Sequence, residues 1–144
     1  MEEKLNDQAL EIIEVELSIL IRRISSFTTY KKIGSLDRSA YLLLHQISSH
    51  GSASVKTLAD EFHLDVSTVS RQTAALEQKS YVYRIPDPVD GRSYSLHITE
   101  QGAAALTENK QARQERVAEL LKSWSAEDQL MFGQLLMKFN RTFD

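Results

Sequence analysis

Five hydroxyl, guanidinium and amide side chains lie close together in one stretch of the sequence: Ser67, Thr68, Ser70, Arg71 and Gln72. Arg71 can form a bidentate hydrogen-bonded pair with guanine and Gln72 with adenine, each pair discriminating by about 1–3 kcal/mol. The serine and threonine hydroxyls suit contacts to phosphates or base edges. The same residue types are also ordinary at a helix start, and an isolated arginine is usually a solvated surface charge. This stretch therefore indicates a DNA contact only in combination with a second feature.

A second group with suitable chemistry is Asp90-Gly91-Arg92. An arginine on a protruding loop favours a narrow minor groove, because the negative potential of DNA is focused there. Arg84 and Lys56 are weaker candidates, for phosphate contacts. The alternative is an ordinary hairpin tip, in which Asp90-Gly91 supplies turn chemistry and Arg92 is solvated.

Two short helices are predicted to position the first group. Ser54 can cap a helix over 55–62, and Asp65 can cap a helix over 66–79. About three residues separate the two helices, and each has a narrow apolar edge. This is the outline of a helix-turn-helix over 54–79.

A β-hairpin is predicted to follow, over 82–98. Residues 81–85 and 94–98 are β-prone, and the loop between them is rich in proline, aspartate and glycine. A helix-turn-helix followed directly by a hairpin is a winged helix. In that arrangement the second short helix enters a major groove and the hairpin tip reaches phosphate or a minor groove.

Longer helices are predicted on both sides of this winged helix. Apolar residues recur at helical spacing over 5–32 and are spread widely enough to meet more than one neighbour. A second helix is expected over 37–49. After the hairpin, a helix over 99–123 has a polar middle, 107–116, which is predicted to be exposed or to line an open space. Ser125 is expected to cap a last, amphipathic helix.

The composition places the chain among folded proteins with one domain, residues 1–144. Five glycines and two prolines are few, which favours a mainly α protein with a small β-hairpin wing. The absence of cysteine excludes disulfides, thiolate nucleophiles and thiolate zinc sites. No apolar run is long enough to cross a membrane, and the acidic N-terminus is unlike a secretory signal, so a cytoplasmic location is expected.

The charge is informative only when it is divided by segment. The total of 17 basic against 20 acidic residues, net −3, argues mildly against a nucleic-acid partner. Residues 66–94 nevertheless contain four basic side chains against three acidic ones, the acids being Glu77, Asp87 and Asp90. This slight positive balance favours DNA over a protein partner for the winged helix.

The segments that carry these features resemble the MarR family of bacterial transcriptional regulators. The resemblance follows the element order of nearly the whole chain and is most specific between Ser54 and Gly102. Its strongest parts are Ser67-Thr68-Val69-Ser70-Arg71, Asp90-Gly91-Arg92 and Leu96-His97-Ile98-Thr99-Glu100-Gln101-Gly102.

The resemblance implies a DNA-binding homodimer on a palindromic operator, most often a repressor that a small ligand releases. It implies dimerisation helices at 1–33 and 101–144, around a winged-helix lobe at 36–100. It further implies that Asp90 holds the guanidinium of Arg92 while that side chain points into a minor groove. The alternative function is a winged-helix module that binds another protein.

The sequence departs from the family pattern at three positions. His63 and Ser80 stand where the family often has glycine, at points where a left-handed backbone is expected. A non-glycine residue there costs on the order of 1 kcal/mol, and histidine is among the more tolerant types. Gly91 replaces a commonly basic residue at the wing tip, which removes one phosphate contact.

Other functional classes find little support. No phosphate-binding glycine loop, nucleophile elbow or paired-carboxylate motif indicates an enzyme. The four histidines do not have metal-ligand spacing, and neither a metal nor another cofactor is expected. Aromatic residues could line a pocket for an aromatic or lipophilic effector, although core packing is their commoner role; the candidates are Phe27, Tyr30, Tyr41 and His45.

Overall fold

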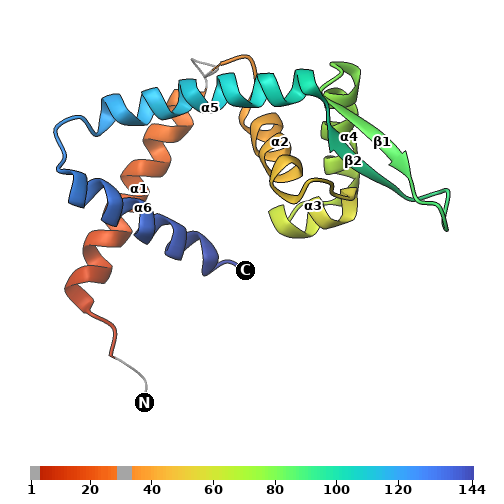
Figure 1. Ribbon diagram of the computed structural model, residues 1–144. Helices are drawn as coiled ribbons and strands as arrows, with labels where there is room; N and C mark the ends of the chain where they lie inside the picture. Colours follow the sequence, from red (N-terminus) through yellow and green to blue (C-terminus); the bar gives the residue numbers. More distant parts are fainter. Residues whose placement is uncertain (1–3, 29–33) are drawn as a thin grey trace. The chain divides into compact units, whose positions relative to one another are not determined.

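The protein forms two compact units, an N-terminal helix and a larger helical unit that contains a two-stranded sheet (Figure 1). A computed structural model describes residues 4–28 and 34–144, with the side chains of 25–28 outside the description. The described part of the larger unit is residues 34–144. The fold is mainly α with one β-hairpin, as the sequence predicts.

The first unit is helix α1, Asp7–Thr28. Its first turn is capped by the side chain of Asn6, whose Oδ1 accepts a hydrogen bond of 3.1 Å from the N–H of Ala9. The large apolar side chains of α1 remain substantially exposed, for example Leu10, Ile13 and Leu20 at 40–50%. The helix therefore presents an apolar stripe, as its sequence periodicity predicts.

Three helices begin the second unit: α2 (Arg38–His50), α3 (Val55–Phe62) and α4 (Val66–Gln78). Asp37 caps α2 and Ser54 caps α3, each through a side-chain oxygen that accepts a backbone N–H, as predicted. The segment between α3 and α4 is short because His63 adopts the left-handed conformation, with φ of 53°.

The hairpin consists of β1 (Val82–Pro86) and β2 (Tyr94–Ile98), which pair antiparallel with Arg84 opposite Leu96. Leu96 also exchanges two backbone hydrogen bonds with Ala53, the residue before the cap of α3. Ser80, with φ of 63°, makes the turn from α4 into the hairpin. The left-handed conformations expected at His63 and Ser80 are both confirmed.

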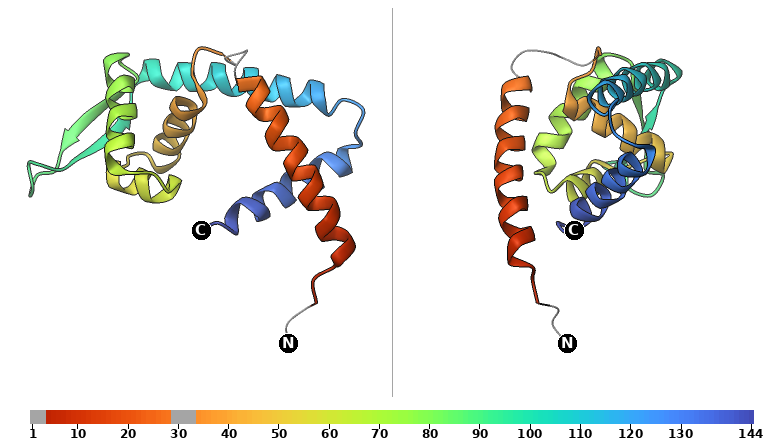
Figure 2. Two further views of the ribbon diagram at one scale, coloured as in Figure 1. Left: turned by 180° about the vertical axis from the view of Figure 1, so that it is seen from behind. Right: turned by 90° about the vertical axis from the view of Figure 1, so that its left-hand side faces the viewer.

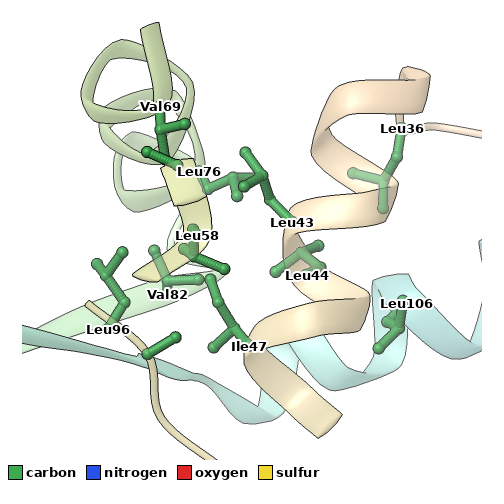
Figure 3. Close-up of a cluster of buried hydrophobic side chains, with 12 residues drawn as sticks. Leu36, Leu43, Leu44, Ile47, Leu58, Val69, Leu76, Val82, Leu96 and Leu106 are labelled. Atoms are coloured by element: carbon green, nitrogen blue, oxygen red, sulfur yellow. The ribbon is translucent and has the colours of Figure 1, made fainter. Parts of the chain in front are cut away.

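A continuous apolar core joins α2, α3, α4 and the hairpin (Figure 3). Leu44 and Ile47 from α2 meet Leu58 from α3, Val69 from α4 and Leu96 from β2, all at most 1% exposed. Each helix contributes its apolar edge, and the hairpin contributes the face opposite the solvent. The core thus fixes the helix-turn-helix to the base of the wing.

Two helices follow the hairpin, α5 (Glu100–Leu120) and α6 (Ala126–Arg141), and the views of Figure 2 show α6 turning back from the end of α5. Gly102 in the first turn of α5 packs so closely on the carbonyl of Tyr81 that a Cβ atom would collide with it. No large apolar side chain of α6 is buried. Within the described residues, no helix combines the length and apolarity that a membrane span requires.

The polar middle of α5 is not uniformly exposed, which corrects the sequence prediction at Asn109. This side chain is fully buried. Its Oδ1 accepts the N–H of Leu36 at 2.9 Å, and its Nδ2 donates to the carbonyl of Ala105 at 2.7 Å and to Ser35 Oγ at 3.1 Å. Gly34, with φ of 76°, leaves no room for a side chain beside this amide. The prediction was wrong because a helical pattern cannot reveal that an adjoining loop supplies polar partners.

Candidate DNA-binding surface

The exposed side of α4 forms a narrow stripe along the helix. Ser67, Arg71, Ala75 and Gln78 recur at steps of four, four and three residues and are all exposed. Val69, Thr73 and Leu76 face the core on the opposite side. The stripe presents a hydroxyl, a guanidinium and an amide on one face, and it adds Gln78 to the residues that the sequence singled out. The amphipathic pattern of α4 could have revealed Gln78.

The N-terminus of α4 is open to an external acceptor. Asp65 occupies the N-cap position that the sequence predicts, but its carboxylate makes no capping hydrogen bond. Among the helices in the described part of the chain, α4 is the one that begins without a side-chain cap. Its free N–H groups, together with the dipole of the helix, suit a phosphate oxygen.

The other three candidates on α4 are less accessible. Thr68 and Ser70 flank the exposed stripe and are half-buried. Gln72 is also half-buried, and its Oε1 atom is buried without a hydrogen-bond partner. The acceptor with which Gln72 would read adenine is therefore turned away from solvent in the free chain, and its use would require a change of rotamer.

The wing tip is organised by Asp87. One oxygen of this carboxylate accepts the N–H groups of Val89 at 2.8 Å and Asp90 at 3.3 Å. These backbone hydrogen bonds, chiefly that from Val89, lower the pKa of Asp87 from its ordinary value. The ionised carboxylate thus fixes the start of the loop that carries Arg92.

We expect this order at the wing tip to be lost in acid. Because the pKa of Asp87 is lower in the folded wing than in an unfolded chain, its contribution is complete above pH of about 4 and disappears as the pH falls through the lowered pKa. An NMR titration should show the Asp87 carboxyl and the Val89 amide changing together, below the ordinary aspartate range. In Asp87→Ala the pH-dependent change of the Val89 amide signal should be absent. A carboxyl that titrates at or above the ordinary range would contradict this assignment.

The contact implied between the Asp90 carboxylate and the guanidinium of Arg92 is not formed in the described structure. Asp90 Oδ1 instead accepts the backbone N–H of Arg92 at 3.1 Å. Both residues are exposed. The cause is the tight turn, which brings the N–H of the next residue but one within reach of an aspartate, while the longer arginine side chain extends into solvent.

The remaining basic candidates differ in their surroundings. Lys56, in the first turn of α3, is exposed and placed on the same lobe as α4. Arg84 is engaged within the protein, since its Nε donates to Glu77 Oε2 at 2.8 Å and its guanidinium lies 4.3 Å above the ring of Tyr94. The structure therefore gives Arg84 partners that the sequence analysis did not foresee.

Two of the four candidate effector residues lie together on α2. Tyr41 and His45 are half-buried, with ring centroids 6.2 Å apart. Arg113 from α5 covers the Tyr41 ring at 4.4 Å, and its Nε is buried without a hydrogen-bond partner. Tyr30 and the side chain of Phe27 lie outside the described residues.

Among the described residues, no group of three histidine or carboxylate side chains is arranged to hold a metal ion. His50 is engaged by a hydrogen bond, with its Nε2 atom 2.8 Å from Glu61 Oε1. This contact ties the end of α2 to α3. The histidine is thus placed in a structural role within the lobe.

The sequence and the fold can be compared with known proteins. The MarR family profile matches residues 36–94, which include the helix-turn-helix and most of the wing. The chain is 46% identical over 139 residues to YxaD, an uncharacterised HTH-type transcriptional regulator of Bacillus subtilis. That match covers 96% of this chain and 97% of YxaD.

Two solved structures share the fold. A mutant of MarR from E. coli complexed with operator DNA has a TM-score of 0.68 and 24% identity, over 93% of this chain and 99% of that one. PcaV of Streptomyces coelicolor, complexed with its natural ligand, has a TM-score of 0.72 and 16% identity, over 99% and 100%. The winged helix, the family profile and the relative matched over 97% of its length agree: this chain is a DNA-binding transcriptional regulator of the MarR family and not an enzyme.

Proposed function

We propose that the protein is a ligand-responsive repressor that acts as a homodimer on a palindromic operator. The observation that carries this proposal is the exposed stripe of α4, with Ser67 and Arg71, beside a wing whose tip presents Arg92. In this arrangement Arg71 contacts base edges in the major groove. Arg92 enters the adjacent minor groove, and Lys56 contacts phosphate.

The proposed homodimer is supported by apolar surfaces at both ends of the chain. Large apolar residues of α6 are 39–64% exposed, the set being Leu130, Met131, Phe132, Leu135, Leu136, Met137 and Phe139. Helix α1 has a similar exposed stripe. Apolar surface of this extent marks a contact with another protein surface. Two-fold symmetry would then place the paired recognition helices about 34 Å apart, one turn of DNA.

The proposed effector is an aromatic or lipophilic molecule bound at the side of α2. Tyr41 and His45 supply half-buried ring surface, and Arg113 adds a cation beside them. The similarity in fold to PcaV, which is complexed with a natural ligand, supports a ligand-responsive regulator. An effector that binds the folded dimer should raise its melting temperature in proportion to the logarithm of its concentration.

The test of the function is a titration against genomic DNA fragments at several salt concentrations. We expect site-selective binding with a steep salt dependence, because cations are released from each contacted phosphate. Arg71→Ala should weaken binding to the selected site by about 1–3 kcal/mol for each half-site, through loss of a base contact. Binding to random DNA should change much less.

Arg38→Ala is the matched control, since Arg38 is an exposed arginine on the same lobe that begins α2 and does not belong to the exposed stripe of α4. Its binding should stay close to that of the unaltered protein. If the unaltered protein shows neither site preference nor salt dependence, the proposed operator binding is wrong. A protein partner whose binding survives Arg92→Ala would then indicate a protein-binding winged helix.

A further inference from the structure

Three side chains connect the recognition helix to both strands of the wing. Glu77 lies in the last turn of α4, Arg84 at the centre of β1, and Tyr94 at the start of β2. Arg84 Nε donates to Glu77 Oε2 at 2.8 Å, and the guanidinium carbon lies 4.3 Å from the centre of the Tyr94 ring. We call Glu77, Arg84 and Tyr94 the wing brace.

The brace lies beside the turn that connects α4 to the wing. The chain turns there through Ser80, which has a positive φ and whose N–H is bonded to the carbonyl of Glu77. The base of the hairpin is fixed by the core through Val82 and Leu96. Arg84 pairs with Leu96 at this base, and the described contacts between wing and recognition helix that involve charged side chains are those of Arg84.

The geometry of Arg84 argues against a direct phosphate contact. One edge of its guanidinium is used by the carboxylate of Glu77, and one face is used by the Tyr94 ring. The paired side chains are 41% and 38% exposed, so the ion pair is screened by solvent and is weak on its own. A planar guanidinium can stack flat on the ring while its edge pairs with the carboxylate, a geometry that the compact ammonium of lysine does not reproduce.

We propose that the wing brace sets the angle at which the wing meets DNA, so that Arg92 enters the minor groove while α4 occupies the major groove. Glu77 and Arg84 are then positioning residues for DNA binding. The inference rests on the proposed contacts of α4 and Arg92. It assigns a favourable role to an acidic side chain at the edge of a DNA-binding surface.

When Glu77 is removed, the wing brace and simple electrostatics predict opposite changes in operator affinity. Removal of Glu77 takes away a negative charge near DNA and releases Arg84, so electrostatics and a phosphate role for Arg84 both predict tighter binding. The brace predicts weaker binding, because the freed wing must be ordered when the complex forms. The sign of the change therefore separates the two interpretations.

The experiment measures operator affinity by fluorescence anisotropy for Glu77→Ala, Arg84→Lys and Arg84→Met. Glu77→Ala should weaken binding about twofold to fivefold, the range for one exposed ion pair. Arg84→Met should weaken it about fivefold to thirtyfold, since the cation–π contact is lost as well. Arg84→Lys keeps the charge and should resemble Arg84→Met. Asp60→Asn, which removes an exposed acid from α3, is the control and should bind as tightly as the unaltered protein or more tightly.

Two further measurements locate the effect in the wing. In an Arg92→Ala background, Glu77→Ala should cause no additional loss, because both changes remove the same minor-groove contact. Hydroxyl-radical footprints of Arg84→Met should lose the minor-groove protection and keep the rest of the site. Melting temperatures of all variants should stay close to that of the unaltered protein.

The brace is refuted if Glu77→Ala binds the operator as tightly as the unaltered protein, or more tightly, or if Arg84→Lys retains full affinity. The brace is also refuted if Glu77→Ala lowers operator affinity as much in the Arg92→Ala background as it does alone. Failure of the proposed function looks different, because Arg71→Ala would then have no effect and the unaltered protein would show no operator to measure. Absence of operator binding would therefore also refute the positioning role of the wing brace.

Discussion

Replacing Leu135 with aspartate should separate the proposed homodimer into monomers and reduce operator affinity by about 10²–10⁴-fold. Leu135 lies on α6 and is 56% exposed in the single chain, so the substitution leaves the core of the winged lobe intact. In a two-fold dimer it would place two carboxylates in an apolar contact, where each must be desolvated. The affinity falls because each lobe then binds its half-site without the high effective concentration that linkage provides.

Light scattering at micromolar concentration and anisotropy on the full palindrome would measure the two effects. Gln134→Asp is the matched control, because Gln134 is the adjacent, exposed polar residue of the same helix. It should remain dimeric and bind normally. A Leu135→Asp protein that keeps both its mass and its affinity would place the dimer contact elsewhere, and a monomeric unaltered protein would refute the dimer itself.

Replacing Asn109 with alanine should lower the free energy of unfolding by about 2–4 kcal/mol. The fully buried amide accepts the N–H of Leu36, and alanine would leave that buried N–H without a partner and open a small cavity, whereas the exposed hydroxyl of Ser35 could bond water. The melting temperature should fall by roughly 6–15 °C for a chain of this size. Because Leu36 begins the winged lobe, we expect the whole lobe of the variant to unfold in a single transition at the lower temperature.

Urea unfolding followed by circular dichroism, at one protein concentration, would measure this change. Glu108→Ala is the control, since Glu108 is the exposed neighbour of Asn109 on α5. Its stability should stay within about 0.5 kcal/mol of the unaltered protein. An equally small change for Asn109→Ala would mean that the buried amide is replaceable.

Much of the fold followed from local patterns. The caps at Asp37, Ser54 and Thr99 mark helix starts that the structure confirms, because a capping side chain acts within three residues of its own position. The apolar edges of α3 and α4 predict the faces that enter the core. The left-handed residues His63 and Ser80 followed from the resemblance to the family.

The candidate DNA-binding surface was predicted less completely. Residue types at 67–72 indicated a recognition helix, but side-chain direction along a helix depends on how that helix packs. In the structure Ser67 and Arg71 are exposed, Gln72 is half-buried, and Gln78 joins them on the exposed stripe of α4. The sequence could not predict the partners of Arg84, because only the packing of the hairpin against α4 brings Glu77 and Tyr94 to it.

The sequence by itself determined the order of the elements, their approximate ends and the family, since these depend on hydrophobic period, caps and motifs of short range. Tertiary structure alone decided which polar groups distant along the chain meet. Asn109 is buried because the loop at Ser35 and Leu36, more than 70 residues away in the chain, supplies hydrogen-bond partners for its amide. Hydrogen bonds depend on distance and angle in space, and a pattern along the chain contains neither.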